Sequence, residues 1–308
     1  MKGYLTLADG GVCALPPLLS WELRYTGSVP CDSFRVSFAC APAIVEALRA
    51  AARFTAEEDG AAALYGVVDE VEVSMSDAGR VAEVSGRGLA ALLLDSEAEA
   101  ATFQNPSAAE VLARYAAPSG IVCGAVPELR SAQPYRVAGG SSEWKALEGF
   151  LSRFPGAAPY FTREGRLELG RVPGRAVLRE ESLLALERRI RRHGVVSEVA
   201  LVARGSGART VVRNEDAVGQ GIRARRVVYV DGSDPVGARR EAEELLARSM
   251  AEADEVTALT VGRFPALPGD TVELVGALSG AAGAYRVSET VRRFGSGGET
   301  TELTMRRE

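Results

Sequence analysis

Residues 64–96 read LYGVVDEVEVSMSDAGRVAEVSGRGLAALLLDS. Apolar and polar residues alternate over Leu64–Met75 and again over Arg80–Gly86, which is the pattern of half-buried β-strands. The turn between the two strands is Ser76–Gly79, and the compact apolar run Gly88–Leu94 predicts a short helix. Because two strands in this order form an antiparallel hairpin, the stretch predicts a β-rich α+β fold.

The chain before this stretch shows the same alternation. Trp21–Tyr25 and Ser33–Phe38 alternate large and polar residues, so a hairpin is predicted around a turn at Gly27–Pro30. Ala43–Phe54 is Ala-rich and breaks the alternation, and it is predicted to form a short helix or an ordered loop. Residues 1–96 are therefore the first β-rich domain of the prediction.

Residues 97–175 change character and predict a small α/β module. A helix is predicted to start at Asn105-Pro106-Ser107, with Asn105 as the cap and Pro106 at the first helical position, where a missing N–H costs nothing. The helix stops before Pro118, and its buried face is predicted to contain Val111, Leu112 and Tyr115.

The second helix of this module is predicted after Gly139-Gly140, with Ser141 or Ser142 as its cap. Pro155-Gly156 ends this helix. Its buried stripe is made by apolar residues at helical spacing, namely Trp144, Leu147, Leu151 and Phe154. A hairpin is then predicted over Tyr160–Leu169.

Residues 176–308 return to strands. Val195–Ala203 and Ile222–Val230 are β candidates, and Asp234-Pro235 opens the strongest helix of the chain, near 234–252. The apolar face of this helix holds Ala242, Leu245, Leu246 and Ser249. Four more strands follow with the spacing of a closed antiparallel barrel or sandwich, at 256–261, 271–275, 284–291 and 300–305.

Composition and charge disfavour several classes of protein. The 308 residues carry a net charge of −5, which argues against a surface specialised for nucleic acid. No apolar run approaches the roughly 20 residues of a membrane helix, and no signal-peptide core follows the N-terminus, so cytoplasmic synthesis without membrane insertion is predicted. The four cysteines fit neither a zinc site nor a disulfide framework: Cys13, Cys31, Cys40 and Cys123.

Few residues suggest catalysis. The only histidine, His193, has no nucleophile motif near it. Gly86-Arg87-Gly88 lacks the third glycine of a dinucleotide-binding loop, and the arginines of Arg188–Arg192 favour ion pairs within the fold or between subunits. Two carboxylate clusters could suggest a glycosidase, but they favour solvated faces: Asp69/Glu70/Glu72 and Glu241/Glu243/Glu244. No catalytic, cofactor-binding or metal-binding residue is predicted, and the protein is predicted not to be an enzyme.

Three stretches, taken in order, resemble one family. The first is Val84–Ser96, continued by Phe103–Leu112 and Pro118-Ser119-Gly120-Ile121. The second is the Trp-containing Ser142–Leu147 with the hairpin that follows it, and the third pairs Leu267–Leu274 with Gly283–Glu289. In this order they resemble the baseplate hub proteins of contractile phage tails, the group of the phage Mu hub and late control protein D. The likeness covers the chain from residue 65 to its end.

The resemblance implies a structural role in which three copies form a ring. Each copy would contribute two antiparallel β-barrel domains, 1–96 and 176–308, that flank the α/β module at 97–175, with the helix near 234–252 as an insertion. The ring would present pseudo-sixfold symmetry to a six-fold tail tube and threefold symmetry to a central spike. Edge strands that would otherwise aggregate could pair across subunits.

The partners implied are a homotrimer, a tail tube or tube-initiator protein above the ring, the central spike below it, and tape-measure protein in the lumen. No cofactor and no specific nucleic-acid binding are implied. The acidic net charge predicts an acidic or neutral lumen. The protein would lie in the baseplate of a virion or tail particle assembled in the bacterial cytoplasm.

Other readings stay open at this stage. The distal tail hubs of siphophages share the barrels, and a tail-associated peptidoglycan hydrolase or a receptor- or carbohydrate-binding tail protein are alternatives. The parent particle could be a phage or prophage, a tailocin or another contractile injection system. The interface residues of the trimer stay unnamed, because one sequence does not assign strand faces to neighbouring subunits.

Overall fold

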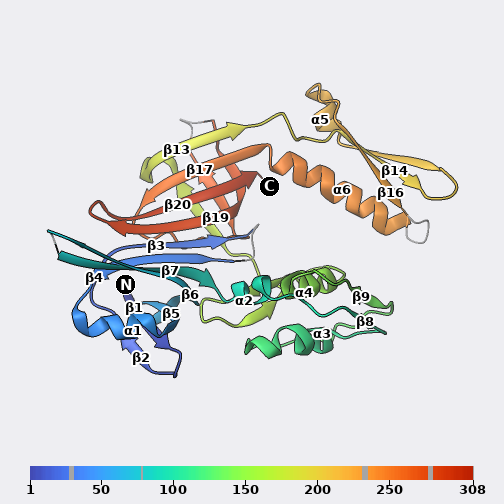
Figure 1. The fold of residues 1–308 in the computed structure, drawn as a ribbon. Coiled ribbons are helices and arrows are strands. Elements are labelled where there is room, and N and C mark those ends of the chain that lie inside the picture. The colour runs from blue at the N-terminus through green and yellow to red at the C-terminus, as the bar shows by residue number, and fades with distance from the viewer. Residues whose placement is uncertain (28–30, 78, 231–234, 277–279, 308) are drawn as a thin grey trace. The chain divides into compact units, whose positions relative to one another are not determined.

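The computed structural model describes residues 1–27, 31–77, 79–230, 235–276 and 280–307, and it is mostly β with a large, mainly antiparallel sheet (Figure 1). The chain divides into two compact units. The first unit holds Met1–Pro173 and Val291–Thr300, and the second holds Gly174–Thr290 and Thr301–Glu308. The prediction of three domains, 1–96, 97–175 and 176–308, stays a prediction beside this division.

Seven strands form the sheet of the first unit, in the order β3-β4-β7-β6-β5-β1-β2. Their bounds are β1 Lys2–Leu7, β2 Val12–Ala14, β3 Leu18–Thr26, β4 Ser33–Ala39, β5 Ala51–Glu58, β6 Ala61–Ser76 and β7 Gly79–Gly88. The β3–β4 and β6–β7 pairs confirm the two predicted hairpins. Residues 28–30 and 78, in the two predicted turns, lie outside the described residues.

One prediction in this unit was wrong for the last third of its length. Within Ala43–Phe54, a 3₁₀ turn at Pro42–Ile44 and the short helix α1, Val45–Arg49, are followed directly by β5. The Ala-rich start of β5 favoured a helix or loop locally. Pairing with β1 on one side and β6 on the other decides the strand, and it buries Phe54 and Ala56.

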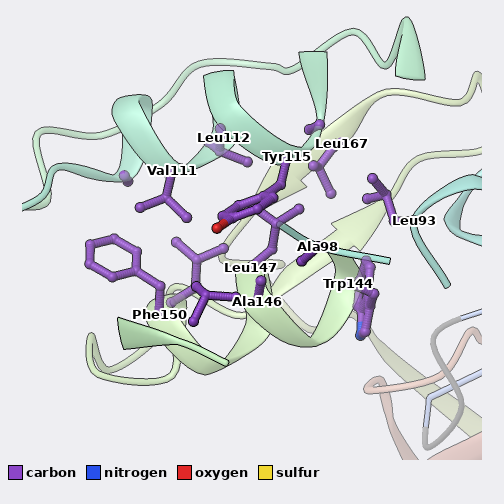
Figure 2. Packing of buried hydrophobic residues seen from close by; sticks show 14 of the residues in the cluster. Leu93, Ala98, Val111, Leu112, Tyr115, Trp144, Ala146, Leu147, Phe150 and Leu167 are labelled. Carbon is purple, nitrogen blue, oxygen red and sulfur yellow. The ribbon is translucent and has the colours of Figure 1, made fainter. Parts of the chain in front are cut away.

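A helical module completes the first unit and has its own core (Figure 2). Figure 2 shows Tyr115 between Leu112 and Leu147, with Phe150 and Trp144 at opposite ends of the cluster. Tyr115, Leu147, Phe150 and Leu151 are all essentially inaccessible to solvent. The elements around this core are α2 Ala90–Asp95, β8 Ala101–Phe103, α3 Ala108–Tyr115, β9 Tyr135–Val137, α4 Glu143–Leu151, β10 Pro159–Phe161 and β11 Leu167–Leu169.

The helix starts in this module are decided by side-chain hydrogen bonds. Asn105 was predicted as the α3 cap, but Ser107 caps the helix and forms a capping box with Glu110. Asn105 instead adopts a left-handed conformation two residues earlier. Of the two candidates for α4, Ser142 is the cap, because its hydroxyl accepts from the Lys145 amide. That helix ends at Leu151, so Phe154 packs on the core from beyond it.

The second unit contains a sheet whose two edge strands, β12 and β13, follow each other in the chain. Its order is β13-β17-β20-β19-β18-β12. The strands are β12 Arg175–Arg179, β13 Leu183–Ile190, β17 Asp254–Val261, β18 Thr271–Val275, β19 Gly283–Gly295 and β20 Gly298–Arg307. They surround a core that includes Leu178, Val256, Val272, Tyr285 and Leu303. The last four predicted strands are therefore present.

The pairing of β12 with β18 is parallel, which differs from the antiparallel arrangement predicted for this region. Asp270, at the start of β18, holds the two strands together. Its buried carboxylate accepts hydrogen bonds from the Gly174 amide at 2.6 Å and the Leu267 amide at 2.8 Å, and the Thr271 amide donates to the Gly174 carbonyl. The Pro268-Gly269-Asp270 turn is thus the device that aligns this pair.

Residues between β13 and β17 form a small α/β layer. Its sheet has the order β15-β14-β16, and the helix α6, Pro235–Ala251, packs on one face through Ala242 and Leu246 (Figure 1). The elements are β14 Glu198–Ala203, β15 Arg209–Arg213, α5 Glu215–Gly219 and β16 Arg225–Val230. This confirms the strongest predicted helix, whose first predicted residue, Asp234, lies outside the described residues.

Candidate assembly interface

The residues considered for catalysis do not come together. His193 is exposed in the loop between β13 and β14. Asp69, Glu70 and Glu72 are exposed along β6 in the first unit, whereas the second carboxylate cluster lies on α6 in the second. On α6, Glu243 and Glu244 pair with arginines one turn earlier, Arg239 and Arg240. Both clusters therefore lie on solvated faces, as the sequence predicted.

Among the residues that the structure describes, no group of three or more histidine, cysteine or carboxylate side chains could hold a metal ion. An open hollow lies over β15 and α6, lined by Val211, Asn214 and Leu246 among others. Its charged lining residues Arg239 and Glu243 already pair with each other at 3.0 Å. The hollow thus offers no convergent set of free polar groups.

Arg87, in the Gly86-Arg87-Gly88 stretch, is a structural ion-pair centre. A register shift between Val68 and Glu70 leaves Asp69 as an extra residue on β6 next to Arg87. The Arg87 guanidinium donates two hydrogen bonds to Asp69, at 2.7 and 3.0 Å, and two to Asp95, at 3.0 and 2.8 Å. These bonds raise the pKa of Arg87 and lower that of Asp95. They connect the end of β7 to the end of α2.

Gly86 is needed for the close approach of two strands. A Cβ at this position would lie 1.9 Å from the Val67 carbonyl oxygen and 2.8 Å from the Phe34 ring. No real Cβ approaches a backbone oxygen so closely, so a side chain there would push β6 and β7 apart. The glycine serves packing, and the arginine beside it is occupied by two carboxylates.

A second arginine centre lies at the tip of the β19–β20 hairpin, which belongs to the first unit. Arg292 donates to both oxygens of Glu58, at 2.9 and 2.8 Å, and to Glu299, and its guanidinium lies 5.3 Å from the centre of the Trp21 ring. Burial alone would lower the pKa of Arg292, but the hydrogen bonds to the two glutamates raise it. The centre joins residues that are 234 positions apart in the chain.

The arginines of 188–192 mostly form ion pairs within the second unit. Arg188 makes a bidentate pair with Asp254 at 2.9 and 2.7 Å, and Arg191 pairs with Glu255 at 3.2 Å. Arg189 pairs with Glu187 two residues earlier on the same strand. The prediction of ion pairs is confirmed for these three arginines within the fold.

The β6–β7 hairpin of the first unit has a free strand edge beyond Val67. β5 pairs with β6 only as far as Val67, so from Val68 to Met75 β7 is its only neighbouring strand among the described residues. This part of β6 exposes Val73, at 45%, and Met75, at 78%. The sequence predicted the strand but not its free edge. The signal available was its length, since the two strands on either side are shorter.

The second unit has an edge of its own at β13. Within the described part of the chain, β17 is the only strand that pairs with it. Leu184 and Ile190 on this edge are 57% and 66% exposed. An unpaired strand edge with exposed apolar side chains can pair with a strand of another chain.

No protein-family profile and no curated protein sequence matches the chain. Solved structures do share its fold. A tail protein from Neisseria meningitidis MC58 has a TM-score of 0.78 at 18% identity, covering 100% of this chain and 96% of that one. The 43 kDa tail protein of prophage MuSo2 from Shewanella oneidensis has a TM-score of 0.80 at 15% identity, covering 100% and 98%.

A more distant likeness reaches secretion machinery. The E. coli c3393 protein, a component of the type VI secretion system described as structurally similar to the T4 phage tail proteins gp27 and gp5, has a TM-score of 0.57 at 12% identity, covering 94% of this chain and 73% of that one. At these identities the likenesses establish the fold. This chain therefore has the fold of phage and prophage tail proteins. None of the helices described here is long and apolar enough to cross a membrane.

Proposed function

We propose that the protein is the structural baseplate hub of a phage-type contractile tail. The observation that carries the proposal is the end-to-end likeness to two phage-type tail proteins, which covers all of this chain and nearly all of each of them. The three motifs that resemble the hub family support it, because each occupies a position that shapes the fold: Arg87 with Asp95, the capped helices α3 and α4, and the Asp270 turn.

In this proposal three copies form a ring. The strands β3–β7 and the β12–β20 sheet would act as the two barrel-like domains of each copy, so that the trimer offers six similar positions to a six-fold tail tube. A threefold spike would dock on the opposite side. The second of these domains is supported by a buried core of its own, which includes Leu178, Val256 and Tyr285.

The proposed role needs no catalytic residue. The charged clusters considered for chemistry serve as internal ion pairs or solvated faces, and the protein would work by joining two symmetries in the baseplate of a tail particle. Peptidoglycan zymography with the purified chain tests the hydrolase alternative directly. A cleared zone would contradict the non-enzymatic role.

The experiment that tests the hub itself is a measurement of molecular mass in solution, followed by electron microscopy of the chain mixed with its spike protein. A trimeric ring that caps the spike is the expected result. A chain that stays monomeric and binds neither spike nor tube protein would refute the proposal.

A further inference from the structure

The free edge of β6 is acidic and only partly neutralised. Asp69 is held by Arg87, but Glu70 and Glu72 have no ion-pair partner among the residues described. Both glutamates are exposed, and Val73 and Met75 follow them along the same free edge. Residues 68–75 therefore present unpaired backbone groups, two free carboxylates and two exposed apolar side chains.

An unpaired cation lies beside the free edge of β13. Arg189 is exposed and pairs only with Glu187 on its own strand, and Arg192, just past the end of the strand, has no ion-pair partner in the described part of the chain. Leu184 and Ile190 supply exposed apolar area on this edge. Arg188 faces Asp254 and Arg189 pairs with Glu187, so Arg192 is the unpaired cation beside this edge.

We propose that the β6 edge of one copy pairs with the β13 edge of the next copy around the ring. The inference rests on the proposed hub function and names the strands that would close its trimer. A ring with cyclic symmetry needs two different, complementary surfaces on each chain, because every contact is head-to-tail. The two edges meet this requirement. They lie in different units, both have unpaired backbone groups, and their free charges are opposite.

The other free edges fit the role less well. β2 has three residues and β12 has five, so both offer few backbone groups. β15 and β16 have five and six residues, and the charges beside them are already matched, because Arg213 and Arg225 both pair with Glu198 between them. The β6 and β13 edges are longer, at eight residues each for 68–75 and Leu183–Ile190.

The test compares three variants of the chain, with charges reversed on the β6 edge, on the β13 edge and on both edges. Glu70→Arg with Glu72→Arg makes both edges basic, and Arg189→Glu with Arg192→Glu makes both acidic. Each pair of changes is expected to weaken self-association about tenfold or more, because like charges then face each other along paired strands. A chain with all four changes has its charges exchanged, and it is expected to regain the trimer.

The matched control for the β6 pair is Glu128→Arg with Glu241→Arg, which makes the same change in net charge at exposed positions away from both edges. Analytical ultracentrifugation gives the association constant, and thermal unfolding checks that each variant is folded. A wild-type trimer that all the reversals leave unchanged would overturn the edge pairing and leave the hub standing. A wild-type chain that stays monomeric at every concentration, alone and mixed with its spike and tube proteins, would overturn both. Failure of the fourfold variant to recover would overturn the pairing of these two edges.

Discussion

Two arginines of the first unit each hold two carboxylates, but at very different depths. The side chain of Arg292 is 4% exposed and its partners Glu58 and Glu299 are 16% and 26% exposed. The side chain of Arg87 is 37% exposed, and its partners Asp69 and Asp95 are 35% and 59% exposed. An arginine with two carboxylates therefore lies in a low-dielectric environment at Arg292 and in a water-exposed one at Arg87.

The difference shows what each centre does. Arg87 connects neighbours in the chain, since Asp95 is eight residues away, and water competes for its hydrogen bonds. Arg292 joins a hairpin tip near the C-terminus to Glu58 at the end of β5. Loss of either residue would remove an ion-pair partner from a buried charged group. We infer that Arg87 shapes a local junction, whereas Arg292 determines whether the hairpin tip docks at all.

The largest expected effect comes from Arg292→Met. This change keeps the apolar volume beside Trp21 but removes the buried guanidinium that donates to Glu58 and Glu299, so the free energy of unfolding should fall by about 3–5 kcal/mol. Urea denaturation followed by far-UV circular dichroism measures the change. Arg293→Met, which removes a half-exposed arginine paired with Glu22 next to it, is the control and should cost far less. Equal effects would show that burial is not what distinguishes the centre.

Asp32 differs from the carboxylates held by the two arginines. Burial raises its pKa by more than its favourable contacts lower it. Burial raises the pKa of Asp32 to about 6. The hydrogen bond from the Thr26 amide, at 2.9 Å, and the charge of Arg163 both lower this pKa but do not offset the burial. Because the folded pKa is above the unfolded value, the unfolded chain releases the proton first, and stability falls as the pH rises from about 4 to 6.

Asp32→Asn removes this titration. The variant should be more stable than the wild type by about 1–2 kcal/mol at pH 8 and should show no such gain at pH 4. Denaturation curves at the two pH values measure the difference. A gain of equal size at both pH values would mean that ionisation of Asp32 is not its cause.

Arg87→Ala should have a smaller effect than Arg292→Met. Water can solvate Asp69 and Asp95 when the arginine is lost, so the expected cost is about 1 kcal/mol. The cost should also shrink when salt is raised to 1 M, because screening acts on exposed pairs. Measuring both arginine variants at low and high salt tests this, and an Arg87 cost that salt does not change would contradict the exposed character of the centre.

The smallest effect belongs to Asp95 alone. Its pKa is lowered by the hydrogen bond from Arg87, so the stability that it contributes is present above its unfolded pKa and is lost as the pH falls through its folded pKa. Asp95→Asn should therefore destabilise the protein slightly at pH 7, and the difference should shrink as the pH falls below the unfolded pKa of Asp95. If Asp95→Asn destabilised the protein equally at low pH, the loss of stability would come from packing and not from the charge of Asp95.

The candidate site was predictable only in part. The strands of the two main hairpins, the α3 face and the Trp144 helix were readable because their patterns repeat every two residues or every three to four. The ion pairs of arginines 188–192 were predictable for another reason, because acidic residues lie near them in the sequence. The cap of α3 was misassigned to Asn105 because Asn, Pro and Ser are all favourable at a helix start, and only the Glu110 contact selects Ser107.

The edges could not be read from the sequence. β6 is free beyond Val67 because its partner β5 stops pairing there, and no property of residues 68–75 themselves records where another strand ends. β5 was hidden for a related reason. Its Ala-rich start has weak local preference, and two strands from elsewhere in the chain decide its conformation.

The sequence by itself determined the class of fold, the order of most of its elements and the acidic and basic character of the two edges that we propose to pair. These depend on side chains within a few residues of each other, which act through the same turn or strand wherever the segment lies. The tertiary structure decided the parallel β12–β18 pair, the burial of Arg292 against Glu58 and the exposure of β6 beyond Val67. The reason is physical: hydrogen-bond partners and desolvation come from residues that are distant in the chain, and only the folded protein brings them together.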